Sequence, residues 1–497
     1  MGTSFGNSQK KGQNAKMNFP ETINYIWDEY ISDSKNNTLL SFEMNQKSLS
    51  YNNKTLIFDS IIKGDKNKSK KLPLYLFLHN GGINQPSYNN GEFLKVRYRY
   101  QSCIQFGIVC SIKGVTDLSN MHYSNESLIL LDRLIKSFII FYNIDPNRVY
   151  LIGLGYGGDG VYKIINLLSC RFAAAVVISG HSYGKPLKNL LNLHLLIQVG
   201  ENDSFSDKNK DAVRTYKEIR EFYANMKNKY EQLNKKKKNL RNFAPLITKI
   251  SRNSNINDSC VECYIHAEKE QDINDYDKKQ NEVPIISDPI KWLSSENNNE
   301  TIDINPNSIN FVNKYTREPL PKFLYWDLTS TLEMPINYSN KQKEEVKDNT
   351  MVKDTRSGGE GFFSGSILAS KDKDEKSSKN TVLVNKSYYW LEIGNVDVNS
   401  LGTLDIITRL DSKNNTVYID SPIKYLRILL NENMIDFQKD VYVIYNEERQ
   451  NIKLVRNYQT ERRTLNERGD YTYIFSAALV FESKDFENFR IYQFEES

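Results

Sequence analysis

The residues with the clearest chemical signature lie in the glycine-rich segment Arg148–Tyr162. Its apolar run Val149–Ile152 predicts a buried strand, the glycines that follow permit a sharp turn, and Val161–Leu168 predicts a helix. A G-x-S-x-G turn in this context presents a serine that attacks ester and amide carbonyls. Here Gly155 stands where the serine would be. Glycine has no side chain with which to attack, and we expect it to adopt a positive φ in so tight a turn.

Glycine-rich turns between a strand and a helix also bind phosphate groups. A Walker loop is excluded because no Lys-Ser or Lys-Thr pair follows Gly158. Gly153, Gly155 and Gly158 do match the spacing of the dinucleotide-binding fingerprint G-x-G-x-x-G. That fingerprint belongs on the first strand of a domain, with an acidic residue closing the next strand. Because the next strand here, Ala173–Ile178, ends in Ser-Gly-His, we favour a site without a cofactor and keep dinucleotide binding as an alternative.

A second glycine-rich loop follows the apolar run Leu72–Leu78, which predicts a central strand. It consists of His79, Asn80, Gly81 and Gly82. In hydrolases a loop of this kind supplies a backbone N–H group to the oxyanion hole, which stabilises the negative oxygen formed during acyl transfer. The same residues are equally consistent with a plain glycine turn at the end of a strand.

Few other residues offer chemistry. His181 follows the strand Ala173–Ile178 and, like His79, is a candidate either for proton transfer or for a structural role beside the pocket. Cys260 and Cys263 have C-x-x-C spacing, but residues three apart on a strand point to opposite faces and no second pair exists to complete a zinc site. We predict no metal site.

The elements around these residues alternate between strand and helix. This alternation predicts an α/β domain with a mostly parallel sheet and helices on both faces. A packing helix is expected at Glu21–Ser32, and the strands and helices expected after it are Thr38–Phe42, Lys54–Ile62, Leu72–Leu78, Phe106–Ile112, Leu128–Tyr142 (helix), Val149–Ile152, Ala173–Ile178, Leu193–Val199, Asp207–Lys227 (helix) and Cys260–His266.

The pattern changes near residue 310, where short runs of alternating apolar residues replace the strand-helix units. We therefore predict three regions: a disordered basic tail over residues 1–16, the α/β domain over 17–309 with a charged insertion at about 228–258, and an antiparallel β domain over 310–497 with a disordered insertion at about 340–380. The strands expected in the β domain are Lys322–Trp326, Ser387–Ile393, Asp405–Leu410, Thr416–Ile419, Tyr425–Leu430, Val441–Tyr445, Ile452–Val455 and Tyr471–Val480.

Composition excludes several classes of protein. The 66 basic and 61 acidic residues give a net charge of only +5, which provides no case for nucleic-acid binding. No apolar run approaches the roughly 20 residues that span a bilayer. Five cysteines, an odd number, without a secretion signal indicate reduced thiols and a cytoplasmic location. The N-terminal Gly2 gives a weak signal for myristoylation, because Gly6 stands where that motif prefers Ser or Thr.

Four segments give the chain a more specific resemblance. They are Gly153–Tyr162, Phe172–His181, Leu190–Asp203 and Lys314–Pro321. On these segments the chain resembles α/β-hydrolases related to bacterial esterases and prolyl-oligopeptidase-like proteins, in which the elbow reads like GYSAGGDGVY. The similarity covers a region from about Leu72 to the C-terminus. The resemblance implies an α/β-hydrolase fold followed by a small C-terminal β domain.

The resemblance also implies where a catalytic triad would lie. The family's serine falls on Gly155, its acid falls on Asp203 in the turn Gly200–Asp203, and its histidine falls at about Gln271. His266 lies several residues before that position, within the predicted strand. Loss of both the nucleophile and the base leaves substrate binding and a possible oxyanion hole.

Two functions follow as hypotheses. The first is a non-catalytic α/β-hydrolase-fold protein that binds or scaffolds a protein partner, or a small ligand in the former cleft. The second is a weak or repurposed ester or peptide hydrolase with a non-standard site. Tyr156, Cys110 and Ser111 are the other nucleophiles near the elbow, but none has an evident base. The pocket is predicted to be lined by His79, Asn80, Gly81, Gly155, Tyr156 and Asp203, with Gly82 and His181 beside it.

Overall fold

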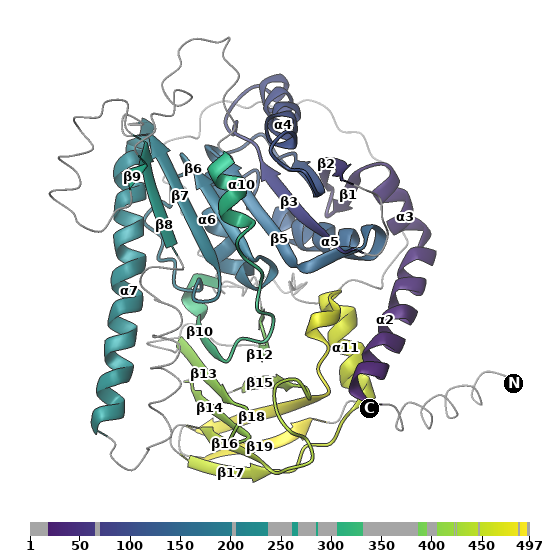
Figure 1. The fold of residues 1–497 in the computed structure, drawn as a ribbon, viewed down its shortest axis with the longest axis vertical. Coiled ribbons are helices and arrows are strands. Elements are labelled where there is room, and N and C mark those ends of the chain that lie inside the picture. Colours follow the sequence, from purple (N-terminus) through teal and green to yellow (C-terminus); the bar gives the residue numbers. More distant parts are fainter. Residues whose placement is uncertain are drawn as a thin grey trace, which may run out of the picture.

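The chain forms an α/β part and a β part, which lie at opposite ends of an elongated molecule (Figure 1). The computed structural model describes residues 18–64, 70–200, 205–236, 261–266, 285–286, 306–331, 386–394, 405–421, 423, 425–445, 448–485 and 488–494, and of the strands at 261–266 and 285–286 it describes the backbone alone.

The α/β part is built on one sheet with the strand order β1-β2-β4-β3-β5-β6-β7-β8-β9. β1 and β2 pair antiparallel, and β2 pairs antiparallel with β4, whereas every pairing from β4 through β3 to β9 is parallel. The predicted mostly parallel sheet is confirmed. The strands are β1 Ser48–Tyr51, β2 Lys54–Lys63, β3 Leu72–Leu78, β4 Gly107–Ile112, β5 Ile144–Leu154, β6 Ala174–Ile178, β7 His194–Gly200, β8 Val261–His266 and β9 Ile285–Ile286.

Helices cover both faces of this sheet because its central strands are apolar on both faces. In β3, Leu74, Leu76 and Leu78 belong to the core shared with α5, α6 and α7, whereas Tyr75 and Phe77 belong to the core shared with α4 and α10. The prediction of helices on both faces is therefore confirmed. These helices are α4 Pro86–Gln101, α5 Asn125–Tyr142, α6 Tyr156–Leu168, α7 Lys208–Lys236 and α10 Pro306–Val312, with short 3-10 turns at Ser169–Arg171 and Phe205–Asp207.

The N-terminal region corrects one sequence prediction. Residues 38–42, expected to form a strand, lie in helix α3 (Thr38–Asn45), directly after helix α2 (Phe19–Asn36). Asn37 explains the difference, because its side-chain oxygen accepts the backbone N–H of Leu40 at 3.0 Å and so caps the new helix. The helix expected at Glu21–Ser32 is confirmed within α2.

The β part consists of two five-stranded sheets, ordered β10-β13-β14-β16-β17 and β11-β12-β15-β18-β19. All pairings are antiparallel except that of β14 with β16, which is parallel. The elements are β10 Phe323–Asp327, a 3-10 turn Leu328–Thr331, β11 Ser387–Tyr388, β12 Leu391–Ile393, β13 Asp405–Asp411, β14 Thr416–Asp420, β15 Tyr425–Leu430, β16 Val441–Tyr445, β17 Glu448–Ile452, α11 Tyr458–Arg468, a 3-10 turn Tyr471–Tyr473, β18 Ala477–Asp485 and β19 Asn488–Phe494.

Several elements differ from those expected. Helix α11 was not predicted, and the strand expected at Tyr471–Val480 starts only at Ala477, after a 3-10 turn. Helix α7 continues to Lys236, past the predicted end at Lys227. Residues 1–17, 237–260 and 332–385, which hold the predicted tail and most of both insertions, lie outside the described residues.

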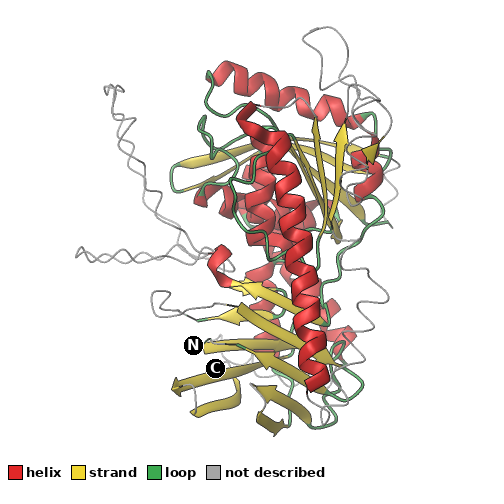
Figure 2. Ribbon diagram, turned by 90° about the vertical axis from the view of Figure 1, so that its left-hand side faces the viewer, coloured by secondary structure: helices red, strands yellow, loops and turns green. Residues whose placement is uncertain are grey.

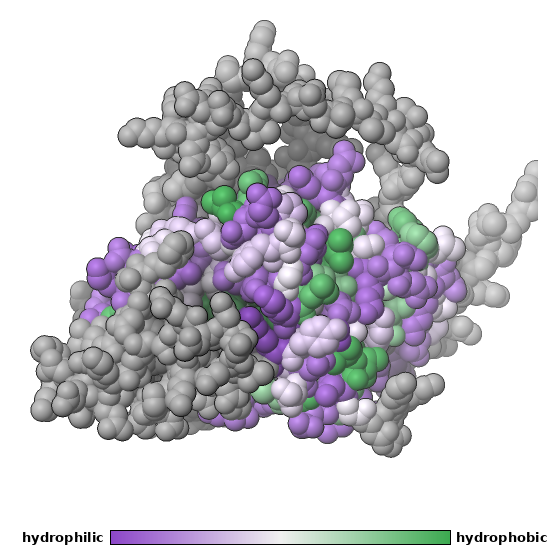
Figure 3. Space-filling model, turned by 90° about the horizontal axis from the view of Figure 1, so that it is seen from above, coloured by the Kyte–Doolittle hydropathy of each residue, from purple (hydrophilic) through white to green (hydrophobic). Residues whose placement is uncertain are grey.

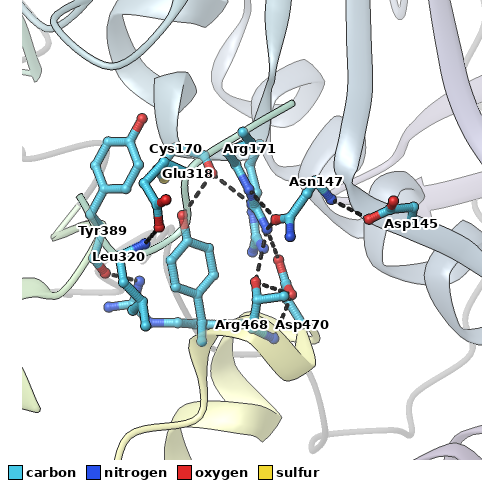
Figure 4. A network of polar contacts seen from close by, with 12 residues as sticks. Asp145, Asn147, Cys170, Arg171, Glu318, Leu320, Tyr389, Arg468 and Asp470 are labelled. Carbon is cyan, nitrogen blue, oxygen red and sulfur yellow. Dashed lines mark hydrogen bonds and ion pairs between the residues drawn. The ribbon is translucent and has the colours of Figure 1, made fainter. Parts of the chain in front are cut away.

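The β part is attached to the edge of the sheet where the parallel strands begin. The backbone N–H of Arg317 donates to the carbonyl of Asn147 near the start of β5 (2.8 Å), and its guanidinium donates to the carbonyl of Cys170 just before β6 (2.8 Å). The hydroxyl of Tyr473 also donates to the carbonyl of Cys170, at 2.9 Å. Figure 4 shows Asn147, Cys170 and Asp470 at this junction. The carboxyl ends of the parallel strands, where the predicted site lies, therefore point away from the β part (Figure 2).

Candidate functional site

The predicted elbow exists as a strand, a one-residue turn and a helix. β5 ends at Leu154, Gly155 has φ 56° and ψ −119°, and α6 starts at Tyr156. The positive φ expected of Gly155 is confirmed. The backbone N–H of Gly155 donates to the carbonyl of Ile178 at 2.9 Å, and its carbonyl accepts the N–H of Asp159 at 3.0 Å. Both backbone groups are satisfied, so the turn is fixed in place between β6 and α6.

Asn80 lies directly against this turn. Its side-chain oxygen Oδ1 accepts the backbone N–H of Tyr156 at 3.2 Å. A Cβ atom added to Gly155 would lie 2.1 Å from the same oxygen and 2.6 Å from Cγ of Asn80. Both distances are far below van der Waals contact. The place in which a nucleophilic side chain would start is therefore occupied by the Asn80 carboxamide.

The imidazole of His79 holds the loop that carries Asn80. Its Nε2 accepts the backbone N–H of Gly114 at 3.0 Å, which leaves the ring proton on Nδ1, where it is donated to the carbonyl of Asn80. His122 packs edge-on against His79 and donates from Nε2 to its backbone carbonyl at 3.0 Å. Burial lowers the pKa of His79 and, more strongly, that of His122. Both rings are neutral structural groups, which makes His79 a poor candidate for proton transfer.

The two glycines of the same loop bring it close to the elbow. Gly81 and Gly82 have φ values of 142° and 83°, and a Cβ added to Gly82 would lie 2.8 Å from the ring of Tyr156. Asn89 on α4 donates from Nδ2 to the carbonyl of Gly82 (3.0 Å) and to Asp117 (2.7 Å), which ties this loop to the one that follows β4. The structure thus brings together Asn80, Gly82, Gly155 and Tyr156.

His181 lies in the next loop, between two buried carboxylates. Its backbone N–H donates to Asp159 Oδ1 at 2.6 Å, and the Tyr183 hydroxyl donates to Asp159 Oδ2 at 2.7 Å. Burial raises the pKa of Asp159 and that of Tyr183, the latter also because its hydroxyl faces this carboxylate. The imidazole Nδ1 accepts the backbone N–H of Tyr183 at 2.8 Å. In this arrangement Nδ1 acts as an acceptor.

The second carboxylate, Asp211, was not singled out from the sequence. It lies in the first turn of α7, is 2% exposed, and accepts the backbone N–H (2.6 Å) and the hydroxyl (3.1 Å) of Ser182. It also forms an ion pair with Arg214, and its Oδ2 lies 3.5 Å from Nδ1 of His181. The one available signal was an acidic residue near the start of a predicted helix, which many surface helices share.

The other positions of the predicted triad are not tested by the described residues. Asp203 and Gln271 lie outside the described residues, and of His266, the last residue of β8, only the backbone is described. Cys110 is fully buried in β4, and burial raises the pKa of its thiol well above the usual value. A buried thiol of this kind is a poor nucleophile.

The sequence matches no protein-family model and no curated protein. Among solved structures it is similar to a thermostable esterase (18% identity, 55% of this chain, 63% of that one, TM-score 0.33), to a lipase/esterase from Lactobacillus plantarum (10%, 35%, 85%, 0.27) and to a candidate dipeptidyl aminopeptidase IV from Bacteroides ovatus (16%, 31%, 27%, 0.24). What the structure itself shows is a mostly parallel sheet with helices on both faces. The chain covers 63% of the thermostable esterase, which is less than two thirds of its length.

The end of the molecule that carries the elbow is exposed and chemically mixed. Figure 3 shows this end, where separate hydrophobic patches lie among hydrophilic residues. Ile83, Leu118 and Tyr183, in loops that follow β3, β4 and β6, are 69%, 56% and 49% exposed. Across the described ranges, no group of three or more His, Cys, Asp or Glu side chains is placed to hold a metal ion, and no helix is long and apolar enough to cross a membrane. Gly2 lies outside these ranges, so its acylation and the cytoplasmic location stay predictions.

Proposed function

We propose that this protein is a non-catalytic α/β-hydrolase-fold protein that acts as a binding or scaffolding module. One observation carries the proposal. At the elbow, the residue in the nucleophile position is Gly155, and the carboxamide of Asn80 lies where its side chain would begin. Acyl transfer through this turn needs a hydroxyl that attacks the carbonyl, and no such group starts there.

The state of the neighbouring imidazoles supports the same proposal. A general base must present an unprotonated ring nitrogen to the nucleophile. His79 donates from one nitrogen and accepts at the other, in both cases with backbone groups, and His122 is buried against it. His194 stacks on Tyr315 with ring centroids 3.7 Å apart, near the opposite edge of the sheet. These three rings have structural roles.

One pair of residues favours the alternative, a weak or repurposed hydrolase. His181 lies 3.5 Å from the Asp211 carboxylate, and its side chain is 17% exposed. In a working triad the carboxylate accepts a hydrogen bond from the imidazole N–H and so orients the ring. Here Nδ1 accepts a hydrogen bond from Tyr183 instead, which argues against that role. His181 is nonetheless the base to test first.

The partner we propose is a protein, or a small ligand held at the former cleft. Support for a partner at this end comes from exposed apolar side chains in the loops after β3, β4 and β6, namely Ile83, Leu118 and Tyr183. Exposed apolar surface is one mark of an interaction site. The β part does not cover them, because it is attached at the opposite edge of the sheet.

A labelling experiment tests the proposal. The purified protein is treated with a fluorophosphonate probe, which reacts only with an activated serine, and is assayed for hydrolysis of p-nitrophenyl acetate beside the variants Gly155→Ala and His181→Ala. We expect no labelling and the same slow hydrolysis for all three proteins. Labelling of the wild type would overturn the proposal. Turnover that disappears in His181→Ala would also overturn it and would identify His181 as the base.

A further inference from the structure

We propose that the Asn80 carboxamide is an internal ligand of the former oxyanion hole. In this inference, which rests on the proposed function, its carbonyl oxygen takes the place that the carbonyl oxygen of an ester or amide substrate would take. Asn80 would then determine what the elbow accepts, because it excludes acyl compounds whether or not a nucleophile is present.

Asn80 accepts a hydrogen bond from the backbone N–H of Tyr156. In acyl-transfer sites on this type of turn, one donor of the oxyanion hole is the backbone N–H of the residue after the nucleophile. That residue here is Tyr156, and its N–H donates to Asn80 Oδ1 at 3.2 Å. The acceptor is an amide carbonyl, which is the same chemical group that a peptide substrate would present to this donor. The donor is therefore already used within the chain.

A side chain at position 155 would also clash with the Asn80 carboxamide. A Cβ at Gly155 would approach three atoms of the carboxamide, Oδ1 at 2.1 Å, Cγ at 2.6 Å and Nδ2 at 3.2 Å. A side chain at position 155 and the Asn80 carboxamide therefore cannot both occupy their present places. Glycine at 155 and asparagine at 80 depend on each other, and a serine at 155 would have to expel the carboxamide and free the N–H of Tyr156.

The backbone on both sides of Asn80 is held independently of this contact. The carbonyl of Asn80 accepts from His79 Nδ1, and the carbonyl of His79 accepts from His122. Two residues further on, the carbonyl of Gly82 accepts from Asn89. These hydrogen bonds fix the loop above α6 without using the Asn80 side chain. Substitutions of Asn80 should consequently remove the carboxamide from the N–H of Tyr156 and leave the loop in place.

The contact also completes the N-terminus of α6. Helices commonly satisfy their first N–H groups with a side chain at the N-cap, and Gly155, the N-cap here, has none. Asn80 supplies the acceptor from another element. The loss of the nucleophile and the gain of an acceptor thus convert a strained catalytic turn into a capped helix.

Unfolding experiments on matched variants test the inference. Gly155→Ser is measured by urea denaturation in three backgrounds: the wild type, Asn80→Gly and Asn84→Gly. Asn84 is the control because it lies in the same loop and donates to the carbonyl of Gly81. We expect Gly155→Ser to raise the equilibrium constant of unfolding about tenfold or more in the wild type and in Asn84→Gly. In Asn80→Gly the increase caused by the same substitution should be smaller by a factor of about ten. An equal effect in all three backgrounds would overturn the inference.

Amide hydrogen exchange provides a test that needs no serine variant. Asn80→Gly should speed the exchange of the Tyr156 amide, measured by mass spectrometry of peptides that span residues 153–160, and Asn84→Gly should not. An unchanged rate in Asn80→Gly would show that the amide does not use Asn80 as its acceptor. Neither result depends on activity, so labelling of the wild-type protein by a fluorophosphonate would refute the proposed function separately.

Discussion

Replacement of Arg317 by Met should destabilise the protein strongly, because it leaves a buried carboxylate without its partner. Arg317 and Asp470 form an ion pair at 2.7 Å, and both side chains are 1% exposed. The guanidinium also donates to the side-chain oxygen of Asn147 and to the carbonyl of Cys170 (Figure 4). Met fills a similar volume but supplies none of these hydrogen bonds.

The magnitude follows from the cost of an unpaired buried charge. Breaking a buried pair by removing one partner costs about 3–5 kcal/mol, whereas replacing both partners can be nearly neutral. The double variant Arg317→Met/Asp470→Asn is therefore the control, since Asn keeps an acceptor for the backbone N–H of Thr472, which Asp470 now accepts at 2.9 Å. We expect the single variant to lose about 3 kcal/mol of unfolding free energy or more, and the double variant to recover most of it.

The loss should also depend on pH. In the wild type, burial raises the pKa of Asp470, but Arg317, Arg171 and hydrogen bonds outweigh it and hold the pKa below its usual value. Without Arg317 the effect of burial dominates and the pKa rises. A carboxyl with a raised folded pKa contributes stability that is complete below its unfolded pKa and is lost as the pH rises through the folded value.

Urea unfolding of both variants at pH 5 and pH 8 measures this dependence. The gap between the wild type and Arg317→Met should be smaller at pH 5 than at pH 8, and the double variant should show little dependence. A single variant that loses less than about 1 kcal/mol, or a gap that widens toward pH 5, would refute the argument that the pair is desolvated.

Three further predictions concern other parts of the chain. Lys163→Met should raise the melting temperature at pH 6 more than at pH 9, because burial lowers the pKa of Lys163 to about 8 and the charged form is disfavoured in the folded protein; an equal gain at both values would contradict this. Asn37→Ala should cost about 1 kcal/mol in urea unfolding through loss of the α3 cap, with Asn37→Ser close to wild type. Iodoacetamide should modify the partly exposed Cys103 in the native protein and Cys110 only after unfolding, as peptide mass mapping would show.

The sequence predicts the sheet and the elbow well because both depend on local patterns. A continuous apolar run such as Leu72–Leu78 is typical of a strand that is buried on both faces, and the glycines after Ile152 permit the positive φ that a tight turn requires. Helix α4 gives no such signal, since Asn89 and Glu92 are among its buried residues, and it was missed. α3 was missed because a short Leu-rich run fits a strand or a helix until the cap at Asn37 is recognised.

The contacts that define the site lie beyond the reach of local patterns. Asn80 and Tyr156 are 76 positions apart, and Ser182 and Asp211 are 29 apart. Nothing in the sequence near either residue specifies its partner. The glycine at position 155 is visible in the sequence, but its close packing against Asn80 appears only in the folded structure.

The position of the β part completes the functional argument. It is fastened to the edge where the parallel strands begin, through Arg317, Asp470 and Tyr473, each of them buried. A domain that covers an active site would instead contact the loops at the carboxyl ends of the parallel strands, where the elbow lies. Because burial of paired charges makes that junction costly to open, the two parts should move as one body. The partner proposed above would therefore meet a surface formed by the loops after β3, β4 and β6, near the carboxamide of Asn80 at the elbow.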